Sequence, residues 1–181
     1  MLETALAYYC GPALAGIKTA NLVSCFRRDY PRLKEELEDL NQKLNDKDIY
    51  FTILCECSER TLIMVYRKQK LWIHLQNGDT VLLLKEFGYP MDSFEKMLEY
   101  LRQRVMKNKE FPHEIGVFLG YPLHDVKGFI EKKEAKYTGH WKVYKQVEEA
   151  KKLFHRYDLC RAAILRQMDR GKDLNALFGT G

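Results

Sequence analysis

The feature of this sequence that most constrains its fold is a pair of strand-like segments in the first half of the chain. Residues 49–57 and 61–66 are both rich in β-branched and aromatic side chains, which are typical of strands. The polar linker 58–60 between them has the length of a hairpin connection. The sequence therefore predicts an antiparallel hairpin over residues 49–66.

A helix is predicted directly before this hairpin, over residues 31–44. Leucines recur in it at three- and four-residue spacing with Lys and Glu between them, and Pro31 suits a first turn. The earlier segment 13–26 fits either a strand or a second helix, and a strand is favoured. The dipeptide Gly11-Pro12 should stop any helix before it, because proline disfavours α geometry in the preceding residue.

The rest of the chain is predicted to be mostly helical, with one extended segment at 141–144 that suits an edge strand. The expected helices cover about 68–76, 79–87, 92–107, 112–119, 123–133 and 146–170. The fold class is therefore α+β, with a small antiparallel sheet made of the hairpin and one or two further strands, packed with several helices. We expect a single domain over residues 1–170 and a frayed tail over 171–181.

Composition limits the function classes without choosing one. The chain has 181 residues, 46% hydrophobic and 30% charged, with a formal net charge of +5, as in an ordinary globular protein. This mild positive charge permits nucleic-acid or anionic-ligand binding but does not require it. No stretch approaches the roughly 18 apolar residues needed to span a bilayer, and Glu3 stands where a signal peptide needs a basic residue.

Nucleotide and metal signatures are absent from the sequence. It contains neither a Gly-x-x-x-x-Gly-Lys-Ser/Thr loop nor a Gly-x-Gly-x-x-Gly motif. Cys55 and Cys57 lack a second Cys/His pair at metal-ligand spacing, so buried strand cysteines are the simpler interpretation. The five cysteines are odd in number and scattered, which predicts reduced thiols and a cytoplasmic location.

The pair His113-Glu114 is the strongest candidate for chemistry. It follows Pro112 at a predicted helix start, where the carboxylate of Glu114 would favour the positive end of the helix dipole. One interpretation is capping and packing. The other is a general acid/base pair, since histidine titrates near neutral pH.

The segment 114–133 also has the spacing of a helix-turn-helix. Gly116 is followed by Gly120, Val126 and Ile130, as expected for two helices that cross at a tight turn. Asp125 and the later Glu131 count against DNA recognition, because phosphates repel carboxylates. A compact helical hairpin is the alternative.

Two further places carry polar residues among apolar ones. Lys18 lies in an otherwise apolar segment, where it either extends to the surface or lines a pocket as an anion-binding amine or one of lowered pKa. The cluster Trp141, Lys142 and Tyr144 either belongs to the core or walls a ligand pocket. Tyr121 is a further candidate for ligand binding.

These segments resemble a known family. The string Phe-Pro-His-Glu-Ile-Gly-Val-Phe-Leu-Gly-Tyr-Pro at 111–122, its continuation to Ile130, the Gly-His-Trp-Lys-Val-Tyr at 139–144 and the opening motif at 10–22 are similar to the DUF3793 family. The likeness covers the chain to about residue 165. It implies an uncharacterised bacterial protein, mostly known from anaerobic Firmicutes, and no established chemistry.

The leading hypothesis is a small-molecule binding or enzymatic domain with one pocket built from the segments around Lys18, His113 and Trp141. Its ligand would be small and anionic: the lysines would neutralise the anion, His113 with Glu114 would handle a proton, and the aromatic residues would pack the apolar part. The alternatives are a nucleic-acid-binding regulator that uses residues 114–133 and a protein-interaction adaptor. No metal, cofactor or membrane partner is nominated.

Overall fold

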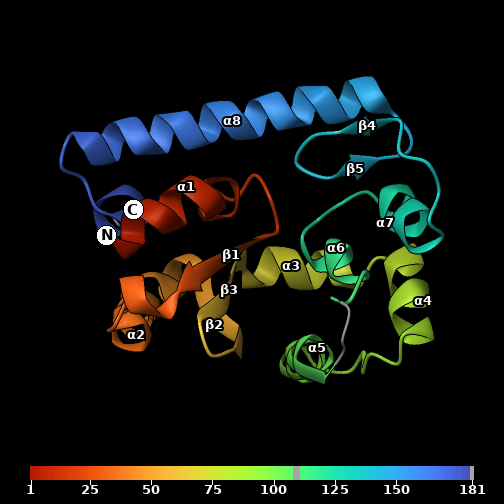
Figure 1. Ribbon diagram of the computed structural model, residues 1–181, viewed down its shortest axis with the longest axis horizontal. Coiled ribbons are helices and arrows are strands. Elements are labelled where there is room, and N and C mark those ends of the chain that lie inside the picture. The colour runs from red at the N-terminus through yellow and green to blue at the C-terminus, as the bar shows by residue number, and fades with distance from the viewer. Residues whose placement is uncertain (108–110, 180–181) are drawn as a thin grey trace. The chain divides into compact units, whose positions relative to one another are not determined.

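The computed structural model of the chain describes residues 1–107 and 111–179, and they form an α+β structure as predicted. The chain divides into two compact units. The first unit comprises Met1–Lys70 and Tyr157–Gly181, and the second unit comprises Leu71–Arg156. Helix α8 (Val147–Asp169) contributes residues to both units (Figure 1). The single domain over 1–170 stays a prediction.

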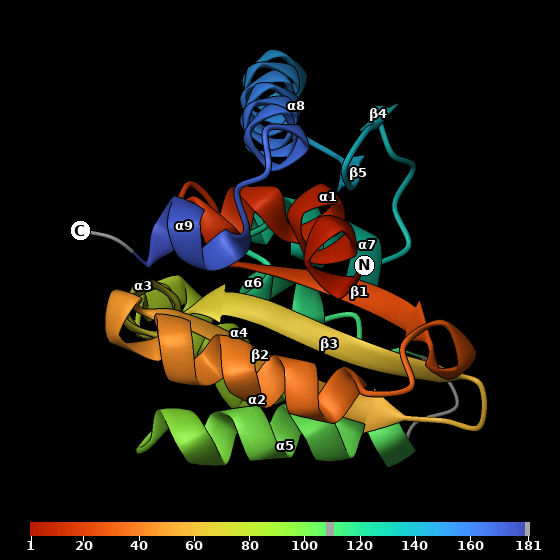
Figure 2. The same cartoon turned by 90° about the vertical axis from the view of Figure 1, so that its left-hand side faces the viewer.

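The first unit contains a three-stranded antiparallel sheet in the order β1-β3-β2, with β3 in the middle (Figure 2). Strands β2 (Ile49–Glu56) and β3 (Arg60–Arg67) form the predicted hairpin, which is confirmed. Strand β1 (Ala20–Phe26) pairs with the other edge of β3, so the strand favoured for 13–26 is found in its second half. The register shifts between Ile53 and Cys55, which leaves Leu54 as the extra residue of a bulge.

One hydrophobic core fills the first unit, and it gathers residues from the sheet and from helices. Helix α2 (Leu33–Leu44) places its leucine stripe in this core, which confirms the predicted periodicity. Helices α1 (Leu2–Leu14) and α9 (Leu174–Phe178) join it, and α9 contacts both α1 and α2. The strands contribute alternating side chains from one sheet face: Val23, Cys25, Phe51, Ile63 and Val65.

The prediction that Gly11-Pro12 stops a helix is wrong, because both residues lie inside α1. Proline disfavours α geometry in the preceding residue through clashes of its Cδ with that residue's N–H and Cβ, and Gly11 lacks the Cβ. Its missing side chain also permits close packing, since a Cβ on Gly11 would lie 3.1 Å from Cδ1 of Ile164. The Pro12 carbonyl still accepts backbone N–H groups, from Ile17 at 3.0 Å and Lys18 at 3.1 Å.

Part of the segment 171–181, expected to be a frayed tail, forms helix α9. The Asp173 side chain accepts the backbone N–H of Ala176 at 2.7 Å and so caps α9. The carboxylate of Glu3 accepts the backbone N–H of Leu174 at 2.7 Å, and the Leu174 side chain is fully buried. These contacts order a helix of one turn and a half, which is too short to show a periodic pattern in the sequence. Residues 180–181 lie outside the described residues.

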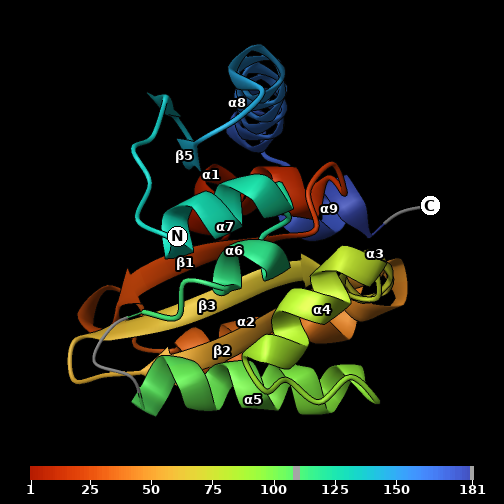
Figure 3. The same ribbon diagram turned by 90° about the vertical axis from the view of Figure 1, so that its right-hand side faces the viewer.

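The second unit is built from helices and a small hairpin (Figure 3). The predicted helices are confirmed as α3 (Lys68–Leu75), α4 (Gly78–Glu86), α5 (Phe94–Lys107), α6 (Ile115–Phe118), α7 (Leu123–Ile130) and α8. Helix α7 ends earlier than the predicted residue 133, where Lys132 takes the left-handed conformation with φ 55°. The extended segment 141–144 contains β5 (Lys142–Val143), whose partner β4 (Tyr137–Thr138) was not predicted.

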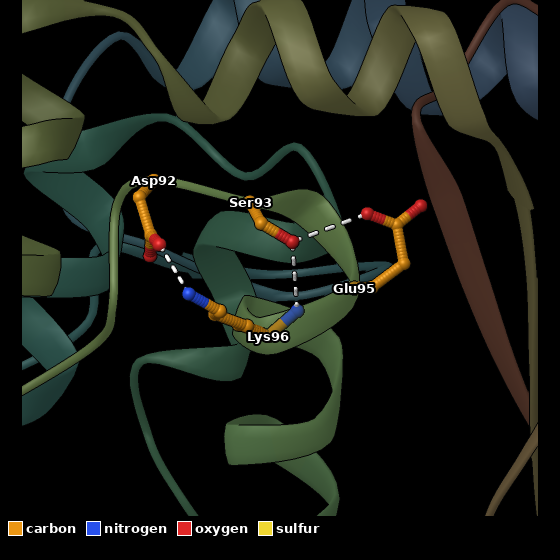
Figure 4. A network of polar contacts seen from close by, with 4 residues as sticks. All are labelled: Asp92, Ser93, Glu95 and Lys96. Carbon is orange, nitrogen blue, oxygen red and sulfur yellow. Dashed lines mark hydrogen bonds and ion pairs between the residues drawn. The ribbon is translucent and has the colours of Figure 1, made fainter.

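Polar contacts fix the start of α5 (Figure 4). The hydroxyl of Ser93 accepts the backbone N–H of Lys96 at 3.3 Å and donates to Glu95 at 3.2 Å. Asp92 forms an ion pair with Lys96 one turn on. The helix then buries Met97 on the face that the sequence pattern predicted.

Within the described residues, none of the helices combines the length and the apolar character that crossing a bilayer requires.

Candidate functional site

Two of the motif segments meet at one pocket of the second unit. The pocket has a volume of about 380 Å³ and lies where α7 contacts α6 and β5. Most of its lining is apolar or aromatic: Phe111, Pro112, Ile115, Gly116, Leu119, Tyr121, Val126, Phe129 and Trp141. Its polar lining residues are His113, Asp125, His140 and Lys142.

Stacked aromatic rings form one wall of the pocket. Tyr121 lies on Trp141 with ring centroids 4.5 Å apart and planes at 25°. Phe154 of α8 meets Trp141 edge to face, at 4.5 Å and 90°. Gly116 makes room for this arrangement, since a Cβ there would lie 3.0 Å from the Tyr121 ring. Burial raises the pKa of Tyr121, so its hydroxyl stays neutral.

Asp125 holds the two motif segments together. It lies in the first turn of α7 and is almost fully buried. One carboxylate oxygen accepts the indole N–H of Trp141 at 2.9 Å, and the other accepts the backbone N–H of Tyr144 at 2.8 Å. The backbone N–H of Lys145 adds a longer bond at 3.4 Å. The carboxylate is thus satisfied by donors from the β5 segment.

The mouth of the pocket combines basic groups with aromatic surface. Phe129 is 38% exposed and Phe111 is 46% exposed. The half-buried His113 meets the Phe129 ring edge to face at 4.9 Å, and Nζ of the exposed Lys142 lies 5.4 Å from the same ring. His140 packs on Phe154 with centroids 5.0 Å apart. A cation beside partly exposed rings is suited to a ligand that is both apolar and anionic.

Glu114 belongs to a different environment from its neighbour His113. Its side chain is fully buried, accepts the hydroxyl of Tyr89 at 3.0 Å and forms an ion pair with Arg104. Burial and the nearby Glu114 raise the pKa of Tyr89, and the bond to Glu114 raises the pKa of Arg104. These contacts favour the packing interpretation for Glu114 and leave His113 as the member of the pair that faces the pocket.

Tyr144 packs beneath α7. A Cβ on Gly128 would lie 2.5 Å from a Tyr144 ring atom, so glycine is what lets the helix approach the ring. Burial raises the pKa of Tyr144, with Asp125 adding to the effect. The backbone N–H of Tyr144 therefore donates to Asp125, while its ring packs against Gly128 of α7.

Lys18 belongs to the first unit, in the turn that follows α1. It is only 6% exposed, and its Nζ lies 5.9 Å from the centroid of the Tyr157 ring. Burial lowers the pKa of Lys18 to about 8, and the neighbouring Cys10 opposes the shift. Of the alternatives for this residue, the buried amine of lowered pKa fits better than a lysine that reaches solvent.

The helix-turn-helix alternative stays a prediction. Helix α6 is a single turn, and α7 buries Val126 and Gly128 on one side. Lys127, Lys132 and Lys133 in and after α7 are exposed, but Lys133 forms an ion pair with Glu131.

Phe111, Asp125, Phe129 and His140 also line the pocket, although the sequence did not nominate them as site residues. For Asp125 a signal was present, since an acidic residue in the first turn of a helix that follows Pro122 is typical of a capping position. Among residues 1–107 and 111–179, no group of three or more His, Cys, Asp or Glu side chains is arranged to hold a metal ion.

Comparison with known proteins identifies a family for this chain. A family model described as "Protein of unknown function (DUF3793)" matches residues 6–178, nearly the whole chain. No curated protein and no solved structure matches the chain significantly.

Proposed function

The chain belongs to the DUF3793 family, and we propose that its second unit binds a small ligand with an apolar body and an anionic group in the pocket lined by α6, α7 and β5. The observation that carries this proposal is the joint lining of one pocket by the segments around His113 and Trp141. A volume of about 380 Å³ lies within the usual range of small-molecule sites.

The charges of the lining support an anionic group at the mouth. The Asp125 carboxylate already accepts N–H groups from Trp141 and Tyr144, so its charge is stabilised from within the protein. Lys142 is exposed beside the opening, with His113 and His140 in the same lining. A carboxylate placed at the mouth therefore meets basic groups, and the apolar part of the ligand meets the aromatic walls.

Backbone-amide NMR titration tests the proposal with two simple probes, phenylacetate and hexanoate. Either probe should shift the amides of pocket residues such as Gly116 and Val126 in a saturable way. The variant Lys142→Met should weaken binding about 1.5-fold to fivefold, which is the range for an exposed charge pair.

Lys152→Met is the matched control, because Lys152 is an exposed lysine of the same unit that does not line the pocket. It should leave the affinity unchanged. Failure of both probes to shift the pocket amides, or equal weakening by the two lysine variants, would count against the proposal.

A further inference from the structure

We infer, on the basis of the proposed function, that the ligands of this pocket are aryl carboxylates, in which a planar aromatic ring carries a carboxylate on a short spacer. The proposed function requires only an apolar body. The ring geometry of the pocket narrows that body to an aromatic one.

The walls include two pairs of aromatic rings beside the aliphatic side chains of Ile115, Leu119 and Val126. Tyr121 and Trp141 form a stacked pair at 4.5 Å, and Phe129 meets His113 edge to face at 4.9 Å. Aromatic pairs in stacked or edge-to-face geometry gain about 0.5–1.5 kcal/mol beyond their buried area. A flat ring that enters this pocket can use both arrangements, and a puckered aliphatic ring can use neither.

Two polar groups of the lining, the indole N–H of Trp141 and the carboxylate of Asp125, already bind other protein groups. The indole N–H of Trp141 donates to Asp125, so Trp141 presents its ring to the pocket rather than its donor. The second oxygen of Asp125 accepts the N–H of Tyr144. A sugar or another polyhydroxyl ligand would have to compete for these groups, whereas an unsubstituted aromatic ring makes no such demand.

The positions of Lys142 and Phe129 at the mouth determine how far the ligand's carboxylate lies from its own ring. Nζ of Lys142 lies 5.4 Å from the Phe129 ring centroid, and Phe129 is 38% exposed. A carboxylate that pairs with Lys142 therefore brings its own ring against Phe129, provided that the spacer between them is short. Covering Phe129 and Phe111 would remove large apolar surfaces from water.

The experiment compares phenylacetate with cyclohexylacetate and phenylacetamide by the same NMR titration. Phenylacetate should bind about twofold to tenfold more tightly than cyclohexylacetate, as aromatic pairing predicts, and more tightly than the neutral amide. Equal or tighter binding of cyclohexylacetate would overturn the aryl inference and leave the proposed function standing. Binding by none of the three would overturn the proposed function itself.

A pair of variants tests the source of the preference. Phe129→Leu keeps an apolar side chain but removes the ring, so the preference for phenylacetate should fall to about twofold or less while cyclohexylacetate binds as before. Tyr137→Leu is the matched control, because Tyr137 is 37% exposed in the same unit and lies outside the pocket lining. An unchanged preference in Phe129→Leu, or the same loss in both variants, contradicts the inference.

Discussion

The buried carboxylate of Asp125 accepts the indole N–H of Trp141 at 2.9 Å, across a sequence separation of 16 residues. Its other oxygen accepts the backbone N–H of Tyr144. One side chain in the first turn of α7 thus binds residues on both sides of β5, one of which forms the pocket wall.

Replacing this carboxylate should destabilise the protein. Asp125→Ala leaves the Trp141 and Tyr144 donors buried without an acceptor, which should cost about 2–4 kcal/mol of unfolding free energy. Urea denaturation followed by circular dichroism measures the loss. Asp79→Ala, at an exposed residue in the first turn of α4, should cost less than about 1 kcal/mol. Equal losses in the two variants would show that the Asp125 bonds contribute little.

The ion pair between Arg104 and Glu114 should be structural. Arg104→Met leaves a buried carboxylate without its cation, and we expect a loss of about 3 kcal/mol. The double variant Arg104→Met/Glu114→Gln removes the uncompensated charge and should regain part of that loss. Arg102→Met is the control, since Arg102 pairs with the exposed Glu99 at 3.4 Å. A double variant that is no more stable than Arg104→Met contradicts the expectation.

Gly128 should tolerate no side chain. A Cβ there would lie 2.5–2.8 Å from three atoms of the Tyr144 ring, so Gly128→Ala must displace α7 or the ring. We expect a loss of about 1–3 kcal/mol in thermal or urea unfolding, even though alanine is the better helix former. At Gly78, the first residue of α4, a Cβ meets nothing within 4 Å. Gly78→Ala should therefore be neutral or slightly stabilising, and a similar result for Gly128→Ala would contradict the predicted clash.

The buried amine of Lys18 should make stability depend on alkaline pH. Its pKa is about 8 in the folded protein against 10.5 as the ordinary value, so between these pH values the unfolded chain binds more protons. Below about pH 8 the folded protein bears the full free-energy cost of burying a charged amine. This cost disappears as the pH rises from about 8 to 10.5, so the folded protein becomes more stable. The stability of Lys18→Met minus that of the native protein should therefore fall by up to about 3 kcal/mol over this range.

Lys43→Met, at an exposed position of α2, provides the reference for this pH series. Its stability difference from the native protein should stay constant over the same range. A constant difference for Lys18→Met as well would show that the amine is not desolvated as the structure indicates.

The sequence predicted those parts of the fold that depend on local patterns. The hairpin 49–66 and the leucine stripe of α2 follow from strand and helix periodicity, and both are confirmed. The helix break predicted at Gly11-Pro12 was wrong, because part of the clash before a proline involves a Cβ that glycine lacks. Strand β4 and helix α9 were missed because two and five residues are too few to show a period, and α9 depends on Glu3, at the far end of the sequence.

The candidate site was less predictable, because its contacts join residues that are distant in sequence. The composition of the motifs pointed to His113, Tyr121, Trp141 and Lys142, which do line one pocket. The sequence could not show that Glu114 and His113 lie in different environments, because the partners of Glu114 are Tyr89 and Arg104, which are distant in sequence. Nor could it identify Asp125 as an acceptor for Trp141, since that bond exists only once α7 and β5 are packed together.

The pocket-wall residue Trp141 is also one of the protein's intrinsic fluorophores. The chain has two tryptophans, Trp72 and Trp141, and both lie in the second unit. Intrinsic tryptophan emission therefore reports on the second unit alone, and the first unit is silent at that wavelength. A ring stacked near Trp141 should alter this emission, which provides a label-free signal for ligand screening and a way to follow the melting of one unit separately from the other.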